Sequence, residues 1–173
     1  MTCEESYPVP SRPTACDTTI LLYLGRIGQI GLLPALFDPV WVPEAVDLEL
    51  DMGRVLRRDT VDPKDLPWAV LVPVPQATID VLPPSRLGPG ELAVIAFANA
   101  HPGCVAGLDD MQARRAAEAL GLPVAGTLGL VVRAKRSGLV PAARPLIDAA
   151  VAEGFHMSPD LYQAALRLAG EAP

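Results

Sequence analysis

The stretch CVAGLDDMQARRAAEALGLPVAG, residues 104–126, decides the fold of this chain. Its apolar start predicts a buried strand at residues 105–108. Alanine and leucine then recur at helical spacing, which predicts a helix at residues 111–120 with Gly121 at its C-terminal cap. A further strand is expected at residues 124–126. Strand, helix and strand in this order predict a βαβ unit and therefore a parallel sheet.

The same alternation extends in both directions from this unit. Further strands are predicted at residues 13–16, 40–42 and 69–74. Helices are predicted at residues 18–27, 31–37, 43–54, 91–100, 128–137, 142–153 and 159–169. The fold class is therefore α/β, with helices on both faces of a central parallel sheet.

The expected organisation is one domain with two additions. Residues 1–13 form a Pro-rich N-terminal arm, residues 14–140 the α/β domain, and residues 141–173 a helical C-terminal extension packed on the same domain. Residues 57–86 are expected to be irregular apart from one strand, because many of the 19 prolines fall there and in the arm.

Composition suits a protein with a substantial core, since half of the 173 residues are apolar. Apolar runs stay below the roughly 18–20 residues needed to cross a membrane. The first residues lack the basic region of a signal peptide. We therefore expect a cytoplasmic protein with no membrane partner.

Cysteine and histidine exclude several kinds of site. Cys3, Cys16 and Cys104 show no CxxC spacing, so neither a disulfide framework nor a zinc site is expected. Cys16 and Cys104 fall in apolar segments and are expected to be buried thiols. His101 and His156, the two histidines, exclude a histidine-rich metal site and argue against a catalytic triad.

Acidic residues stand at the junctions between elements. Five are singled out by their position: Asp17, Glu49, Glu91, Asp109 and Asp110. Several follow strands or begin helices, and the carboxyl ends of parallel strands meet at one edge of a sheet. Carboxylate oxygens are preferred ligands of Mg²⁺ and Mn²⁺, so a metal site that binds a phosphate oxygen is expected there.

Each acid also has an ordinary explanation. Asp17 could cap the helix that follows it, and Glu91 could oppose a helix dipole. Glu49 could be a solvated helix residue. One of the Asp109–Asp110 pair could cap the helix at residues 111–120, but a cap does not require the second aspartate.

The net charge of −6 argues against a nucleic-acid partner unless a cation lies among the acids. The five acids contribute five of these negative charges, so a divalent metal would largely remove the objection. Six basic residues of the second half could be solvated or could together flank a phosphate-binding cleft: Arg114, Arg115, Arg133, Lys135, Arg136 and Arg144.

Short motifs in a fixed order carry a family resemblance over residues 15–170. They are Asp17-Thr18-Thr19, Pro34-Ala35-Leu36-Phe37, Val42-Pro43-Glu44-Ala45-Val46 followed by Glu49, Leu87-Gly88-Pro89-Gly90-Glu91, Leu108-Asp109-Asp110 with Ala113-Arg114, Gly126-Thr127-Leu128-Gly129, and residues 147–168 with Gly154-Phe155 and Ser158-Pro159. In these the chain resembles the PIN-domain superfamily. More narrowly, it is similar to a bacterial branch of unknown function, related to VapC-like toxins and described as predicted nucleic-acid-binding proteins.

The resemblance implies a three-layer α/β/α PIN-like fold and a Mg²⁺- or Mn²⁺-dependent ribonuclease, the toxin of a toxin–antitoxin pair. A metal-activated water would attack the RNA phosphodiester in line, leaving a 5′-phosphate and a 3′-hydroxyl. RNA, a small antitoxin and a second copy of the chain are the implied partners. By similarity, the catalytic residues are Asp17, Glu49, Glu91 and Asp110; the metal ligands are Asp17, Glu91, Asp109 and Asp110; the substrate-binding residues are Thr18, Thr19 and Arg114.

Two other functions stay open at the level of the sequence. A non-catalytic PIN-like protein-interaction or regulatory module is favoured by the negative net charge, the sparse basic residues and Ala93, where this branch often carries a second acid. A phosphatase or other hydrolase built on the same acidic edge is a third reading, although no motif supports it.

Overall fold

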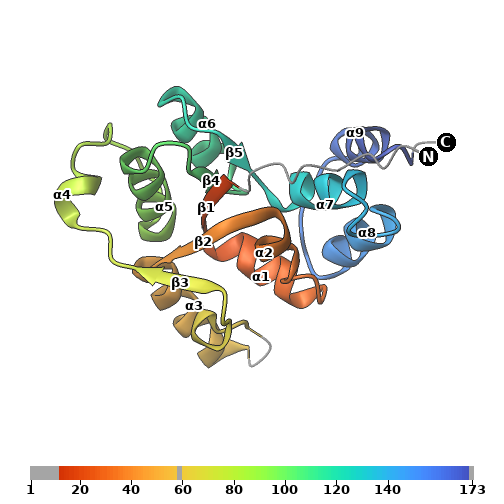
Figure 1. Ribbon diagram of the computed structural model, residues 1–173, viewed down its shortest axis with the longest axis horizontal. Helices are drawn as coiled ribbons and strands as arrows, with labels where there is room; N and C mark the ends of the chain where they lie inside the picture. Colours follow the sequence, from red (N-terminus) through yellow and green to blue (C-terminus); the bar gives the residue numbers. More distant parts are fainter. Residues whose placement is uncertain (1–11, 58–59, 172–173) are drawn as a thin grey trace, which may run out of the picture.

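A parallel sheet forms the centre of the computed structural model, which describes residues 12–57 and 60–171. Its strands are β1 Arg12–Cys16, β2 Phe37–Pro43, β3 Ala69–Val72, β4 Val105–Gly107 and β5 Val124–Ala125. The order is β3-β2-β1-β4-β5, and every neighbouring pair is parallel. The predicted α/β class with a central parallel sheet is confirmed (Figure 1).

Helices cover both faces of this sheet (Figure 1). They are α1 Thr18–Arg26, α2 Leu32–Leu36, α3 Glu44–Leu56, α4 Gln76–Ile79, α5 Pro89–Ala100, α6 Met111–Ala119, α7 Thr127–Arg136, α8 Arg144–Ala152 and α9 Pro159–Ala169, with a short 3₁₀ helix at Pro63–Asp65. Because crossovers between parallel strands are right-handed as a rule, the strand order places α5 and α6 on one face and α1, α2, α3 and α7 on the other. This is the three-layer α/β/α arrangement that the resemblance implies.

The largest errors in the predicted elements lie beside prolines. Phe37, predicted to end a helix, instead begins β2, the extended segment that continues through Asp38, where Pro39 disfavours helical conformation. The strand predicted at residues 69–74 ends at Val72, since Pro73 has no N–H to donate. The stretch predicted to be otherwise irregular also holds α4 and the 3₁₀ helix.

The starts of two elements, β1 and α8, differ from expectation. Arg12 and Pro13, assigned to the Pro-rich arm, belong to β1, while residues 1–11 lie outside the described part of the chain. Helix α8 begins at Arg144 rather than 142. The carboxylate of Glu171 accepts hydrogen bonds from the backbone N–H of Ala143 at 2.6 Å and of Arg144 at 2.9 Å, which caps this start from the C-terminal segment.

The core has two parts. The larger lies between the sheet and its helices, and a second cluster joins α7 to the C-terminal helices α8 and α9. Cys16 and Cys104 are buried free thiols, as predicted, although Cys104 lies one residue before β4. Burial raises the pKa of Cys104 to about 11 and that of Cys16 further, so both are inert at neutral pH. No helix in the described ranges is long and apolar enough to cross a bilayer.

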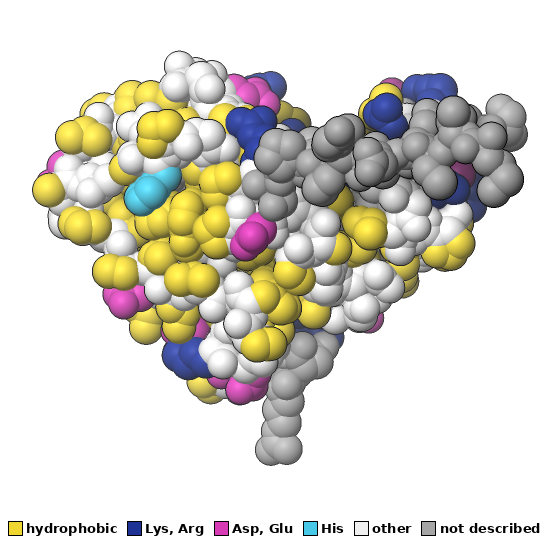
Figure 2. Space-filling view, in the orientation of Figure 1, with side chains coloured by type: hydrophobic (Ala, Val, Ile, Leu, Met, Phe, Trp, Pro, Cys, Tyr) yellow, Lys and Arg dark blue, Asp and Glu magenta, His cyan; other side chains and the backbone are white. Residues whose placement is uncertain are grey.

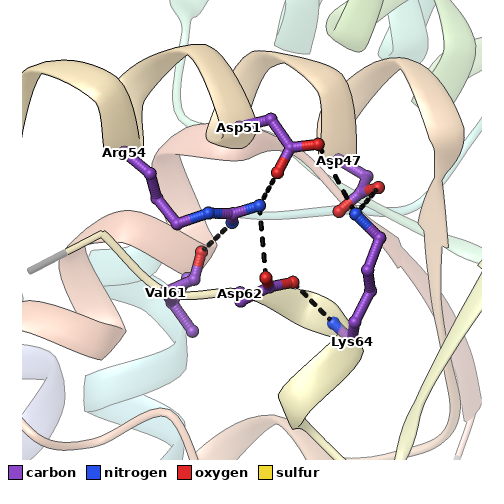
Figure 3. A network of polar contacts seen from close by, with 6 residues as sticks. All are labelled: Asp47, Asp51, Arg54, Val61, Asp62 and Lys64. Atoms are coloured by element: carbon purple, nitrogen blue, oxygen red, sulfur yellow. Dashed lines mark hydrogen bonds and ion pairs between the residues drawn. The ribbon is translucent and has the colours of Figure 1, made fainter. Parts of the chain in front are cut away.

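A charged network fastens helix α3 to the segment that follows it (Figure 3). Arg54 pairs with Asp51 on the same helix and with Asp62 at 3.3 Å. Lys64 reaches the buried Asp47 at 2.7 Å. These contacts hold the face of α3 that carries Asp47 and Asp51 against the following segment, and Glu49, between them in sequence, lies on the opposite side of the helix.

Candidate functional site

A cavity of about 250 Å³ opens at the carboxyl end of β1. It is lined by Asp17, Thr18, Thr19, Glu49, Gly88 and Glu91. These residues come from the start of α1, the middle of α3 and the start of α5. The structure therefore brings Asp17, Glu49 and Glu91 together at one edge of the sheet, and their catalytic and metal-binding roles stay predictions.

Asp17 is both a helix cap and a member of the cavity. Its Oδ1 accepts a hydrogen bond from the backbone N–H of Ile20 at 3.0 Å, and only 3% of the residue is exposed. Burial raises the pKa of Asp17 to about 8, with the charges of Asp109 and Glu91 adding to the shift. An ionised Asp17 side chain without a nearby cation is therefore energetically unfavourable in the folded state.

Glu49 is held by donors from two other helices rather than solvated. The hydroxyl of Thr18 donates to its Oε2 at 2.5 Å, and the backbone N–H of Gly90 donates to its Oε1 at 2.8 Å. A Cβ at residue 90 would lie 2.7 Å from Glu49 Oε2. Glycine at this position is therefore what allows α3 and the start of α5 to approach so closely.

Glu91 forms the capping box of α5. Its Oε2 accepts a hydrogen bond from the backbone N–H of Gly88 at 2.9 Å. Burial raises the pKa of Glu91, and the charges of Asp110 and Glu49 raise it further. Glu91 can therefore both stabilise the start of α5 and belong to the acidic site, because the same carboxylate also lines the cavity.

Asp110 is the member of the aspartate pair that caps α6. Its Oδ1 accepts hydrogen bonds from the backbone N–H groups of Gln112 at 2.8 Å and Ala113 at 2.9 Å. It is exposed and acts electrostatically on Glu91. Both hydrogen bonds use the same oxygen, so the cap does not engage Oδ2.

Asp109 faces α7 and does not line the cavity. The backbone N–H of Thr127 donates to its Oδ1 at 2.8 Å, and the Thr127 hydroxyl donates to its Oδ2 at 2.6 Å. Burial raises the pKa of Asp109, whereas Thr127 and Arg114 act in the opposite direction. Asp109 as a direct metal ligand stays a prediction.

The basic residues do not gather around the cavity as a group. Arg114 Nη1 donates to the backbone oxygen of Leu108 at 3.1 Å, and its charge opposes the rise in the pKa of Asp109. Arg133 donates to the backbone oxygen of Leu36 at 3.3 Å, and Arg144 to that of Glu171 at 3.1 Å. Arg133 and Arg144 therefore hold chain segments together.

Sequence reasoning assigned no role to three residues of this region. Gly88 and Gly90 supply the N–H groups that hold Glu91 and Glu49, and Thr127 holds Asp109. The available signal was the Gly-Pro-Gly-Glu spacing before α5, since a glycine beside a carboxylate indicates close approach of the backbone. Thr127 had no comparable local signal, because its partner lies 18 residues away.

The chemistry of this site fits a hard divalent cation. The cavity lining offers carboxylate oxygens and no Lys or Arg. In the part of the chain that the structure describes, no three His, Cys, Asp or Glu side chains are close enough to hold an ion jointly. Mg²⁺ commonly takes only one or two protein carboxylates and keeps several waters, so the side chains suit such a partly hydrated ion.

Comparison with known families gives one finding about the whole chain. A family model described as a PIN domain matches residues 13–171, from the second residue of β1 to the second residue after α9. Comparison with curated proteins gives no match.

Proposed function

The chain belongs to the PIN-domain family, and from this premise we propose that it is a Mg²⁺- or Mn²⁺-dependent ribonuclease. The PIN domain is a nuclease-type fold. The observation that carries the proposal is the cavity at the end of β1, where Asp17, Glu49 and Glu91 meet without a basic residue in the lining. Carboxylates gathered in this way repel one another unless a cation joins them.

Asp17, Glu91 and Asp110 would hold the metal, directly or through water, and Asp109 is an additional candidate. A bound metal would stabilise charge on a phosphate oxygen and make water a stronger nucleophile at neutral pH. Glu49 completes the catalytic set.

The protein's own contribution is to fix the acids in place. Asp17 is oriented by its cap on α1, and Asp110 by its cap on α6. Glu49 is oriented by Thr18 and Gly90. Carboxylates that are already positioned do not have to reorganise when charge develops on the phosphate.

Three residues in or beside the cavity are candidates for contact with the RNA or for positioning the site. Thr19 lines it and carries a hydroxyl that can donate to a phosphate oxygen. Thr18 would act by orienting Glu49. Arg114 could reach a phosphate by leaving the backbone oxygen of Leu108, a neutral acceptor that a charged phosphate would outcompete.

The biological setting is also part of the proposal. The resemblance to VapC-like toxins supports a toxin that cleaves RNA in the cytoplasm and is neutralised by a small antitoxin protein. The products would carry a 5′-phosphate and a 3′-hydroxyl.

Calorimetric titration with Mn²⁺ tests the metal site first. We expect micromolar binding by the wild type and none by Asp17→Asn/Asp110→Asn. The control variant Asp38→Asn/Asp160→Asn removes the same charge from two exposed positions and should bind like the wild type. Absence of binding by the folded wild type would overturn the proposal. With binding established, single-stranded RNA cleavage in Mn²⁺ should be lost in the same double variant.

A non-catalytic interaction module is the second candidate, and specific observations favour it. No three potential ligands of the described chain converge, and Ala93 adds no acid to the site. Hydrophobic side chains cover much of the described part of one face, with Lys and Arg scattered at its margins (Figure 2). A surface of this kind suits protein contact better than RNA, and the module becomes the preferred function if Mn²⁺ does not bind.

A further inference from the structure

A second cavity, of about 770 Å³, is bordered by β5, α7 and α9 and is here called the apolar cavity. It shares no described lining residue with the acidic cavity at the end of β1. Its volume is within the range of roughly 300–1,000 Å³ that is usual for small-molecule sites. The proposed nuclease activity gives this cavity no role.

The walls of the apolar cavity are mainly aliphatic. Leu161 and Leu168, which are 46% and 64% exposed, belong to this lining, so part of the apolar surface is open to solvent. Burial of such a surface against the methylene groups of a ligand is favourable through the hydrophobic effect. The aliphatic lining residues include Val124 of β5, Leu128 and Leu130 of α7, and Leu161 and Leu168 of α9.

Three arginines add positive charge to these walls: Arg12, Arg114 and Arg133. None of them takes part in the ion pairs of the described residues. Asp109 is the one acid among the described lining residues, and two donors of Thr127 already hold its carboxylate. In a chain whose net charge is −6, this cavity is therefore locally positive and complements an anion.

Two of these guanidinium groups lie against the cavity wall. Cζ of Arg133 is 5.1 Å from the centre of the Phe37 ring, and Phe37 lines the cavity. Nη1 of Arg114 lies beside Gly126, another lining residue, where a Cβ would be 2.7 Å away. Each group donates one N–H to a backbone oxygen. Because a guanidinium carries five N–H groups, donors remain for a carboxylate.

The shortage of other polar groups decides the body of the ligand. Apart from the arginines, only Asp109 and His156 bring side-chain nitrogen or oxygen atoms to the described lining. A nucleobase buried there would leave several polar groups without partners, whereas an alkyl chain has none. We propose that the apolar cavity binds a free straight-chain fatty acid, with its chain between α7 and α9 and its carboxylate on Arg114 or Arg133.

Calorimetric titration of the full chain with octanoate, decanoate and dodecanoate, below the concentrations at which micelles form, tests this site. Affinity should rise about fourfold with each added CH₂ group, because each one buries more apolar surface. Ala164→Phe places a ring in the cavity and should abolish dodecanoate binding, whereas Ala152→Phe on the exposed surface of α8 should bind like the wild type. Arg133→Gln should weaken binding about 10-fold. Arg136→Gln removes the same charge from an exposed position of α7 outside the lining and should not weaken it.

Dodecyltrimethylammonium has the same chain with the opposite charge and should not bind. Absence of dodecanoate binding by the folded wild type, equal binding of this cation, or wild-type binding by Ala164→Phe would each overturn the proposal. Tighter binding of AMP would assign the cavity to a nucleotide instead. Displacement of dodecanoate by a peptide of residues 1–11 would assign it to that segment of the chain. Circular dichroism verifies that each variant is folded, and Mn²⁺ titration tests the acidic cavity separately, so the two proposals can fail independently.

Discussion

Helix α3 carries two groups of acids whose surroundings are opposite. On one side, Asp47 and Asp51 lie against Lys64 and Arg54, so their charges are balanced within the chain (Figure 3). Glu49 is two residues from each of them and points into the cavity, where only neutral donors meet it. The same helix thus contributes acids to an ion-pair network and to a site that lacks cations.

The surroundings of these acids separate those that the chain itself neutralises from those that it leaves without a cationic partner. The paired aspartates contribute to folding through neighbouring Lys and Arg side chains. In the cavity, burial and like charge raise the pKa values of Asp17 and Glu91 and outweigh the backbone hydrogen bonds from Ile20 and Gly88 that lower them. A group of acids that the chain itself does not neutralise is suited to an external cation.

The largest expected contrast is in metal-dependent function. Asp17→Asn should lower Mn²⁺ affinity and RNA cleavage by at least about 100-fold, because it removes a carboxylate from the cavity. Asp62→Asn removes a carboxylate from the ion-pair network and should leave both quantities within about twofold of the wild type. Calorimetry and a cleavage assay measure the two effects. Equal losses in both variants would show that the two groups of acids do not differ in function.

The second largest effect should be on how the free energy of unfolding depends on pH, which the buried Asp17 of the cavity should change. Burial raises the pKa of Asp17 from 3.8 to about 8, so the folded state binds this proton more tightly than the unfolded chain does. The stabilising contribution of the shift is complete below pH 4 and is lost as the pH rises through 8. Asp17→Asn keeps a capping oxygen without the charge. Without metal it should therefore be more stable than the wild type at pH 9, by more than about 2 kcal/mol.

Urea unfolding at pH 4 to 9 measures this difference. The stability gap between Asp17→Asn and the wild type should widen with pH and narrow when Mn²⁺ is added, because the metal stabilises the wild type alone. A gap that is constant over this pH range would mean that Asp17 does not titrate as proposed.

The ion-paired acids of α3 should depend for their stability on the basic side chains beside them. Lys64→Met leaves Asp47 buried without its ion pair and should lower the free energy of unfolding by about 1–2 kcal/mol. Mn²⁺ affinity should not change, since Lys64 does not line the cavity. Adding Asp47→Asn should recover part of the loss. A Lys64→Met variant with weaker Mn²⁺ binding would instead link the network to the site.

The sequence predicted the sheet and the acidic edge because both depend on local patterns. Alternating strands and helices imply a parallel sheet, and residues after its strands must meet at one edge. Asp17 and Glu91 could therefore be placed near each other in advance, whereas Glu49, in the middle of α3, could not. The start of β2 near Pro39 and the end of β3 before Pro73 were missed, because the apolar pattern does not show where proline disfavours a helix or ends a strand.

The roles of individual acids depended on contacts between distant segments. Asp109 and Asp110 are adjacent and chemically identical, and sequence alone could not tell which one caps α6. The deciding partner of Asp109 is Thr127 at the start of α7, which only the folded sheet brings near. Similarly, Glu49 reads as a solvated helix residue until α3 is packed against Thr18 and Gly90.

The smallest expected effect concerns this positioning of Glu49. Thr18→Val removes the hydroxyl that donates to Glu49 Oε2 at 2.5 Å while keeping the shape of the side chain. Mn²⁺ affinity should fall about 3- to 10-fold and stability by about 1 kcal/mol, because the Gly90 N–H still holds the other oxygen. Thr18→Ser keeps the donor and should bind Mn²⁺ nearly as well as the wild type. If valine and serine behave alike in calorimetry, the hydroxyl does not orient Glu49, and its position depends on Gly90.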